Sequence, residues 1–182
     1  MLNINFTPFP NLTTHRLELR QLNINDTSNI SLLRSDQRVN EFIDRPVSTT
    51  LEDAKKFIEK IENGIVANEW IYWAITLKNH PTLIGTICCW NISAENDMAE
   101  IGYELKPEFH GQGIMQEAIS KVIAFGFEEI KLKVITALPK KGNDKSIKLL
   151  LKNNFKLDTS NKYVNMESAD GLLVYYLTPD IK

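Results

Sequence analysis

The stretch that decides the fold runs from residue 100 to residue 118 and reads EIGYELKPEFHGQGIMQEA. Its first residues, up to Leu105, predict a strand, and the glycines Gly111 and Gly113 bracket the point where a helix is expected to begin. Glycine lets the backbone approach a ligand closely, and the N–H groups in the first turn of a helix have no intrahelical partner. The spacing therefore predicts a strand, a loop and an anion-binding cradle.

Two familiar nucleotide-binding patterns do not fit this cradle. A P-loop needs Lys followed by Ser or Thr after its last glycine, but Ile114 and Met115 follow Gly113. A dinucleotide fingerprint needs a third glycine where this chain has Gln116, and an acidic residue about 20 residues further on, near Lys133. From these residues alone, a glycine-rich turn that merely starts a helix is an equally good interpretation.

Outward from this stretch, apolar patterns predict the remaining elements. Strands are expected at residues 16–22, 69–78, 83–92, 99–107, 132–139, 155–158 and 172–178, and helices at 27–33, 50–68, 112–129 and 143–155. Residues 1–15 are expected to form a surface lead-in. This order predicts an α/β (α+β) fold, with a mixed central sheet of about seven strands and helices on both faces.

Composition narrows the class of protein. A chain of 182 residues is expected to form one domain, residues 1–182, and 43% hydrophobic residues with 24% charged ones exclude a disordered chain. The net charge of -2 favours neither nucleic acid nor a membrane as partner. Because neither a secretion signal nor an 18-residue apolar run is found, we expect a cytoplasmic protein. Three scattered histidines predict no metal site, and the oligomeric state, monomer or homodimer, stays open.

Four segments in the right order resemble the GNAT superfamily of acetyl-CoA-dependent N-acyltransferases. More narrowly, they resemble the RimJ/RimL branch, which acetylates protein N-termini, notably of ribosomal proteins. The segments are TTHRLELRQL (13–22), YWAITLKNHPTLIGTI (72–87), AEIGYELKPEFHGQGIMQEAI (99–119) and NDKSIKLLLKNNF (143–155). The resemblance covers about residues 13–178 and implies a GNAT fold, with acetyl-CoA as cosubstrate and an amine as acceptor.

The resemblance also implies where acetyl-CoA binds. Its pyrophosphate would meet the backbone amides of the cradle, and its pantetheine would bond to the edge of strand 101–105 where that strand diverges from strand 134–138. The implied cofactor-binding residues are Ile101, Tyr103, Leu105, His110, Gly111, Gln112, Gly113, Ile114, Met115 and Asn143. The chain departs from the family pattern at His110, usually Gln or Arg, and at Met115, usually a small residue. A solvent-facing role for His110 is an equal alternative.

Two polar residues at the start of the last helix are candidates for handling the thiol. Asn143 and Ser146 are three residues apart and so share one helix face. The resemblance implies that Asn143 contacts pantetheine and that Ser146 lies near the leaving thiol. Because Leu150 stands where many GNAT enzymes carry a tyrosine acid, Ser146 is the expected proton donor. The alternative is that Asn143 is only a helix cap and Ser146 an incidental polar residue.

Glu100 is the candidate general base. The resemblance places an acidic residue near the substrate at this position, and strand alternation puts Glu100 and Glu104 on one face. A solvated carboxylate at a strand end is the alternative. An α-amino group has a pKa of about 7.7–8.0, so a modest base suffices to deprotonate it.

The identity of the acceptor is the least determined part of the prediction. The expected acceptor is the α-amine of a protein N-terminus. The alternatives are a small amine, such as a polyamine or aminoglycoside, and a regulatory module that binds acyl-CoA without turnover. An acidic mouth for a cationic amine is a further possibility, with the candidate residues Glu41, Asp44, Glu167 and Asp170.

Overall fold

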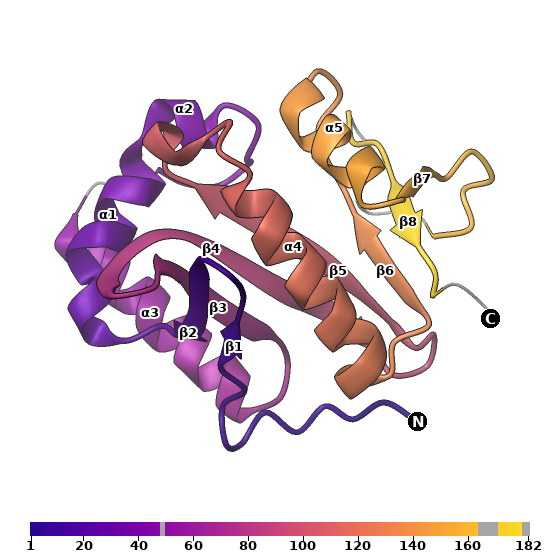
Figure 1. Cartoon of the computed structure of the whole chain (residues 1–182), viewed down its shortest axis with the longest axis horizontal. Helices are drawn as coiled ribbons and strands as arrows, with labels where there is room; N and C mark the ends of the chain where they lie inside the picture. The colour runs from indigo at the N-terminus through magenta and orange to yellow at the C-terminus, as the bar shows by residue number, and fades with distance from the viewer. Residues whose placement is uncertain (48–49, 164–170, 180–182) are drawn as a thin grey trace.

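A computed structural model describes residues 1–47, 50–163 and 171–179. Its strands form one sheet in the order β1-β2-β3-β4-β5-β6-β8-β7, in which only the β5–β6 pair is parallel (Figure 1). The strands are β1 (Leu12–Thr13), β2 (Leu17–Gln21), β3 (Ile71–Leu77), β4 (His80–Ser93), β5 (Met98–Leu105), β6 (Val134–Ala137), β7 (Lys156–Leu157) and β8 (Tyr175–Leu177). The expected mixed sheet is confirmed.

The described helical segments are η1 (Ile24–Asp26), α1 (Thr27–Ser35), α2 (Gln37–Asn40), α3 (Leu51–Val66), η2 (Pro107–Phe109), α4 (Ile114–Phe125), the π-helical turn η3 (Gly126–Ile130) and α5 (Asp144–Lys152). Four of them, η1, α2, α3 and α5, begin at a capping side chain. At the start of α3, Thr50 Oγ1 accepts a hydrogen bond from Asp53 N at 3.0 Å, and the Asp53 carboxylate accepts one from Thr50 N at 3.1 Å. Within the described ranges, no helix is long and apolar enough to cross a membrane.

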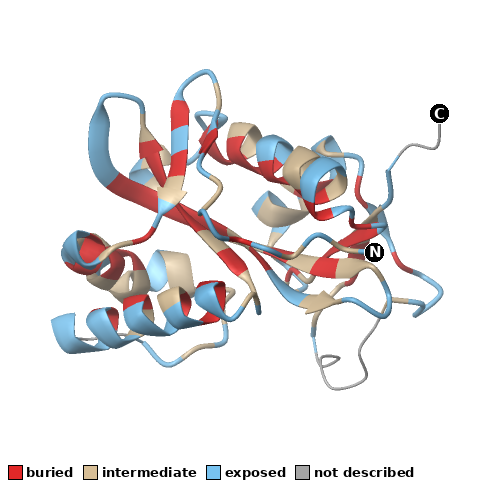
Figure 2. Cartoon of the chain, turned by 90° about the horizontal axis from the view of Figure 1, so that it is seen from below, coloured by how far each residue is buried: buried red, intermediate tan, exposed pale blue. Residues whose placement is uncertain are grey.

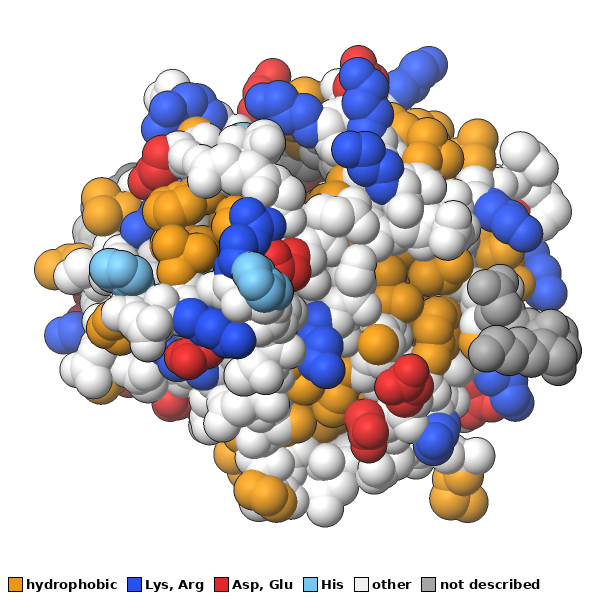
Figure 3. Space-filling model, in the orientation of Figure 1, with side chains coloured by type: hydrophobic (Ala, Val, Ile, Leu, Met, Phe, Trp, Pro, Cys, Tyr) orange, Lys and Arg blue, Asp and Glu red, His pale blue; other side chains and the backbone are white. Residues whose placement is uncertain are grey.

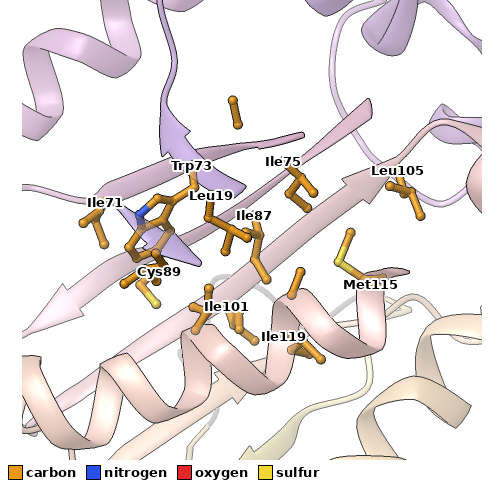
Figure 4. Packing of buried hydrophobic residues seen from close by; sticks show 14 of the residues in the cluster. Leu19, Ile71, Trp73, Ile75, Ile87, Cys89, Ile101, Leu105, Met115 and Ile119 are labelled. Carbon is orange, nitrogen blue, oxygen red and sulfur yellow. The ribbon is translucent and has the colours of Figure 1, made fainter. Parts of the chain in front are cut away.

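Alternate residues of the central strands pack against helices on opposite faces of the sheet. In β3, Tyr72 meets Phe57 of α3 edge-on at 5.7 Å, whereas its neighbour Trp73 meets Phe125 of α4 edge-on at 5.4 Å. Figure 2 shows the buried residues concentrated in the sheet and on the helix faces turned toward it. Met115 and Ile119 of α4 complete the core on the Trp73 side (Figure 4). Helices therefore cover both faces, as expected.

The N-terminal segment differs from the expectation. Residues 12–13 pair with β2 and add an eighth strand, so the segment is not a simple surface lead-in. Phe6 is buried, and Trp73 Nε1 donates a hydrogen bond to Pro10 O at 2.8 Å. Such contacts between residues far apart in the sequence leave no local periodic signal.

Three predicted boundaries also shift. Helix α4 begins at Ile114 rather than at residue 112, because Gly113 has a φ of 73°, in the left-handed region that a helix cannot include. At the other end, a π-helical turn replaces the α-helix from Gly126 onward. Strand β6 ends at Ala137, one residue earlier than the resemblance implies.

The parallel pairing of β5 with β6 is short, and this positions the site. It runs only from the pair Met98–Val134 to the pair Glu100–Thr136. Beyond that point β5 continues beside β4 as far as Leu105, while β6 continues beside β8. Within the described part of the chain, the edge of residues 101–105 that would face β6 therefore has no strand partner.

Candidate active site

The cradle has the backbone that the glycines predict. Gly111 and Gly113 have φ values of 72° and 73°, and a Cβ added to Gly111 would meet no atom within 4 Å. Over residues 111–115, no N–H group donates a hydrogen bond to any acceptor in the described structure. These donors lie at the start of α4, where the helix dipole favours an anion. A phosphate group fits this arrangement.

A salt bridge between β2 and α4 holds the cradle in place. Arg16 Nε donates to Glu117 Oε2 at 2.7 Å, and the backbone N of Arg16 donates to Glu117 Oε1 at 2.7 Å. The Thr14 hydroxyl also donates to this carboxylate. Arg16 Nη1 then reaches Gln112 O at 3.0 Å, inside the cradle. Burial alone would raise the pKa of Glu117, but the hydrogen bonds from Thr14 and Arg16 lower it to about 2.

Several side chains at the cradle turn away from it. His110 is exposed, but its Nε2 lies at hydrogen-bond distance, 2.9 Å, from Leu105 O. The imidazole therefore links the end of the loop that follows β5 to the last residue of that strand. The Gln112 amide donates to Glu108 O at 2.8 Å. Met115 packs into the core with only 9% of its surface exposed, and Ile114 is also buried. The backbone of these residues, rather than their side chains, faces the cradle.

At the start of α5, the structure brings together two hydroxyl groups. Asn143 is the helix cap, because its Oδ1 accepts a hydrogen bond from Ser146 N at 3.1 Å. The Ser146 hydroxyl lies 2.8 Å from the hydroxyl of Tyr103. Tyr103 belongs to the part of β5 that pairs with β4 but no longer with β6. Burial raises the pKa of Tyr103 to about 12, although the bond with Ser146 opposes this. Tyr103 therefore remains protonated at neutral pH.

Glu100 lies where β5 and β6 separate. It is half-buried, and its Oε2 accepts a hydrogen bond from Asn91 Nδ2 at 3.0 Å. Burial raises its pKa, and hydrogen bonds from Asn91 and Trp90 only partly oppose the shift. Glu104 shares this face of β5 but pairs with Arg45 at 2.7 Å, so it has a different environment. Because strand residues alternate, Glu100 and Tyr103 lie on opposite faces of β5.

The structure describes two of the four candidates for an acidic mouth, Glu41 and Asp44. Asp44 pairs with Lys140 Nζ at 2.6 Å, so its charge is already balanced. Glu41 is exposed, while Glu167 and Asp170 lie outside the described residues. On the face drawn in Figure 3, basic side chains gather along the edge where α2 and α5 lie.

The two cysteines, Cys88 and Cys89, are not suited to act as nucleophiles. Burial raises the pKa of Cys89 to about 12 and that of Cys88 well above its usual value, so neither thiol is prepared to form a thiolate. Outside the masked positions, no group of three His, Cys, Asp or Glu residues could hold a metal ion.

Comparison with known proteins adds the family. Residues 16–156 match the model of the acetyltransferase (GNAT) domain. The chain belongs to the GNAT acetyltransferase family. It is 34% identical over 147 residues to YoaA, an uncharacterized N-acetyltransferase of Bacillus subtilis (strain 168), and this match covers 81% of this chain and 83% of YoaA.

Two solved structures show the same fold. Ribosomal-protein-S5-alanine acetyltransferase from Vibrio fischeri superposes with a TM-score of 0.79 and 22% identity, over 94% of this chain and 97% of that one. The microcin C7 self-immunity acetyltransferase MccE, solved in complex with acetyl-CoA and AMP, superposes with a TM-score of 0.77 and 21% identity. This match covers 91% of this chain and 93% of MccE. The family match, rather than these two structures, identifies the chain as an N-acetyltransferase that uses acetyl-CoA.

A valine at position 113 tests the cradle. Gly113→Val places a β-branched residue at a φ of 73° beside the unpaired N–H groups, so the dissociation constant for CoA should rise at least about tenfold. Gly171→Val is the matched control, because Gly171 has a φ of 84° and open space around its Cβ, outside the cradle. Calorimetry that finds unchanged CoA binding by folded Gly113→Val protein would contradict the assignment.

The salt bridge behind the cradle predicts a pH-dependent stability. Because the pKa of folded Glu117 is about 2, its stabilising effect is complete above the unfolded value of about 4.3 and is lost as the pH falls toward 2. Glu117→Gln should therefore melt at a lower temperature than the wild type at pH 7, with a gap that narrows below about pH 4.3. Glu128→Gln, at an exposed position of η3, is the control. A gap independent of pH would rule out the ion pair as its source.

Proposed function

We propose that this protein transfers the acetyl group of acetyl-CoA directly to the α-amine of a protein N-terminus, in a ternary complex. The observation that carries the proposal is the separation of β5 from β6, with a carboxylate on one face of β5 and a pair of hydroxyls on the other. The name of the Vibrio fischeri protein, a ribosomal-protein acetyltransferase, supports this class of acceptor.

On the donor side, the cradle and the edge of residues 101–105 hold acetyl-CoA. The backbone N–H groups of residues 111–115 bind its pyrophosphate, and the free edge of β5 offers hydrogen bonds to pantetheine. When bound, acetyl-CoA supplies a thioester whose carbonyl carbon accepts the amine. Asn143 caps α5 and so fixes the position of Ser146 beside this edge.

On the acceptor side, Glu100 takes the proton of the attacking amine. Burial makes this carboxylate more basic than an exposed one, which suits a base working near neutral pH. An α-amine needs only modest help because its pKa is about 7.7–8.0, whereas a lysine side chain titrates near 10.4. The site therefore suits an α-amine better than a lysine.

The Ser146 hydroxyl donates a proton to the departing thiolate. Tyr103 supports it, because the phenol stays protonated and can donate its hydrogen to Ser146 Oγ. This bond directs the serine's own hydrogen away from Tyr103, toward the open edge of β5. The two hydroxyls thus form a short proton relay, in which Tyr103 of β5 donates to Ser146 of α5 and Ser146 donates to the thiolate.

An amine panel tests the proposed acceptor. With acetyl-CoA present, N-terminal peptides should release free thiol with a kcat/KM at least about tenfold above that for polyamines and aminoglycosides, a difference of about 1.4 kcal/mol. Release only with the small amines would contradict the proposed acceptor. CoA binding without release from any amine would instead support a regulatory module.

Glu100→Gln should change the shape of the pH–rate profile. In the wild type, activity falls as the pH drops and Glu100 becomes protonated at its raised pKa. The variant should lose about 10²–10⁴-fold near neutral pH and recover at higher pH, where the amine deprotonates itself. Glu95→Gln, at an exposed position of the β4–β5 turn, is the control. A wild-type profile for Glu100→Gln would remove Glu100 from the mechanism.

A further inference from the structure

Arg34 is a cation without a hydrogen-bond partner. It lies in the last turn of α1, and its guanidinium carbon is 3.9 Å from the centroid of the Phe57 ring in α3. Its Nε is buried and unsatisfied, and no acceptor among the described residues bonds to any nitrogen of its guanidinium. Since most buried polar groups in proteins are hydrogen-bonded, this arrangement points to an acceptor supplied by a ligand.

The charges around Arg34 leave a surplus cation. Arg45 pairs with Glu104 at 2.7 Å, and these side chains are only 12% and 6% exposed. Arg45 Nε also donates to Asn40 Oδ1 at 2.7 Å. Glu104 is therefore already neutralised, and Arg34 and Arg45 together outnumber it by one charge. Burial, and after it the charge of Arg45, lower the pKa of Arg34, while Glu104 and Tyr72 only partly oppose the shift. A further anion beside Arg34 would therefore offset the cost of burying its charge.

Among the described residues, the buried side-chain polar atoms that lack a hydrogen bond all lie at this place. Although Arg45 Nη2 and Glu104 Oε2 are close, their angles are not those of a hydrogen bond. Together with Arg34 Nε, they are the only buried side-chain polar atoms without a hydrogen-bond partner in the part of the chain that the structure describes, although Arg45 and Glu104 still form an ion pair. We call Arg34, Arg45 and Glu104 the arginine cluster.

A chain of contacts connects the arginine cluster to the face of the sheet that carries Glu100. Phe57, under Arg34, meets Tyr72 edge-on, and the Tyr72 hydroxyl lies 2.9 Å from Thr86 Oγ1 and 3.4 Å from Glu104 Oε1. Glu104 is four residues beyond Glu100 on the same face of β5, which corresponds to about 13 Å along the strand. The cluster therefore lies on the acceptor side, beyond the proposed base.

We propose that Arg34 binds a carboxylate of the acceptor, namely an acidic side chain in the first few residues of the N-terminus that is acetylated. The inference rests on the proposed function. With its α-amine at Glu100, an extended peptide advances about 3.3–3.6 Å per residue, so the distance of about 13 Å to Glu104 corresponds to about four residues. An acidic side chain at the third position, which adds its own length, therefore reaches the cluster. A guanidinium stacked on an aromatic ring is pre-organised to bind a carboxylate with two parallel hydrogen bonds.

Peptides that differ only in this carboxylate test the proposal. A peptide beginning Ser-Glu-Glu should be acetylated with a kcat/KM at least about tenfold above that of Ser-Gln-Gln, because hydrogen bonds between charged partners are the strong ones. Arg34→Gln should abolish this preference by lowering the value for the acidic peptide alone, with CoA affinity unchanged. Arg38→Gln is the matched control, because Arg38 lies close by in α2, is exposed and already pairs with Asp36 at 2.6 Å.

The outcomes separate this inference from the proposed function. Equal rates for the two peptides in the wild type, or a preference that survives Arg34→Gln, would overturn the role of Arg34 while leaving peptide acetylation intact. If no peptide is acetylated, the proposed acceptor fails, and calorimetry with the same peptides and the CoA-saturated wild type tests Arg34 without turnover. Tighter binding of the acidic peptide by at least about tenfold supports the site, and equal binding overturns it.

Discussion

The early end of the parallel pairing between β5 and β6 is the constraint on which the site depends. A strand edge inside a sheet normally satisfies its N–H and C=O groups through its neighbour. Here the pairing with β6 ends at the pair Glu100–Thr136, while β6 keeps its pairing with β8 on its other edge as far as Ala137. The unpaired edge of residues 101–105 lies at this separation, with the Glu100 carboxylate on one face of β5 and the Tyr103–Ser146 pair on the other. In the proposed function, acetyl-CoA binds along this edge and the side chains on the two faces move the protons.

The anion cradle depends on a second, electrostatic constraint. Two left-handed glycines leave the N–H groups before α4 without partners, and such a loop would be free to rearrange if nothing held it. Arg16 and Glu117 tie β2 to the first turn of α4, and Arg16 also bonds to the carbonyl of Gln112. The buried stripe of α4 fixes the helix itself against the sheet. Binding a phosphate then requires little reordering of the backbone, which is the advantage of a pre-organised site.

The sequence predicts those features whose causes are local. The strand, loop and helix around the glycines, the cap at Asn143 and the capping box at Thr50 all follow from residues within one or two turns. Just after α5, Asn154 has a φ of 64°, a left-handed conformation that asparagine adopts more readily than most residues. Contacts between residues far apart in the chain cannot be predicted from a single sequence. The Arg16–Glu117 salt bridge joins residues 101 positions apart, and no pattern in the sequence around either residue predicts it.

The same distinction explains the candidate site. The sequence indicates Ser146 and Tyr103 separately, and the hydrogen bond between them joins residues 43 positions apart. The sequence leaves Asp44 available for a cationic acceptor, but in the structure Asp44 pairs with Lys140. Arg34 has no signal in the sequence, because an arginine in the last turn of a helix is ordinary. Only its buried Nε, which has no hydrogen-bond partner within the described residues, distinguishes it.

The central claim is that the N–H groups of residues 111–115 and the unpaired edge of β5 hold acetyl-CoA. The most direct measurement is a titration of the ¹⁵N-labelled protein with CoA, followed through its backbone amide resonances. The account predicts the largest shifts at residues 111–115, with smaller ones along residues 101–105. Unchanged amides at residues 111–115, with the largest shifts instead in the groove on α3 lined by Lys56, Lys60 and Trp70, would contradict it.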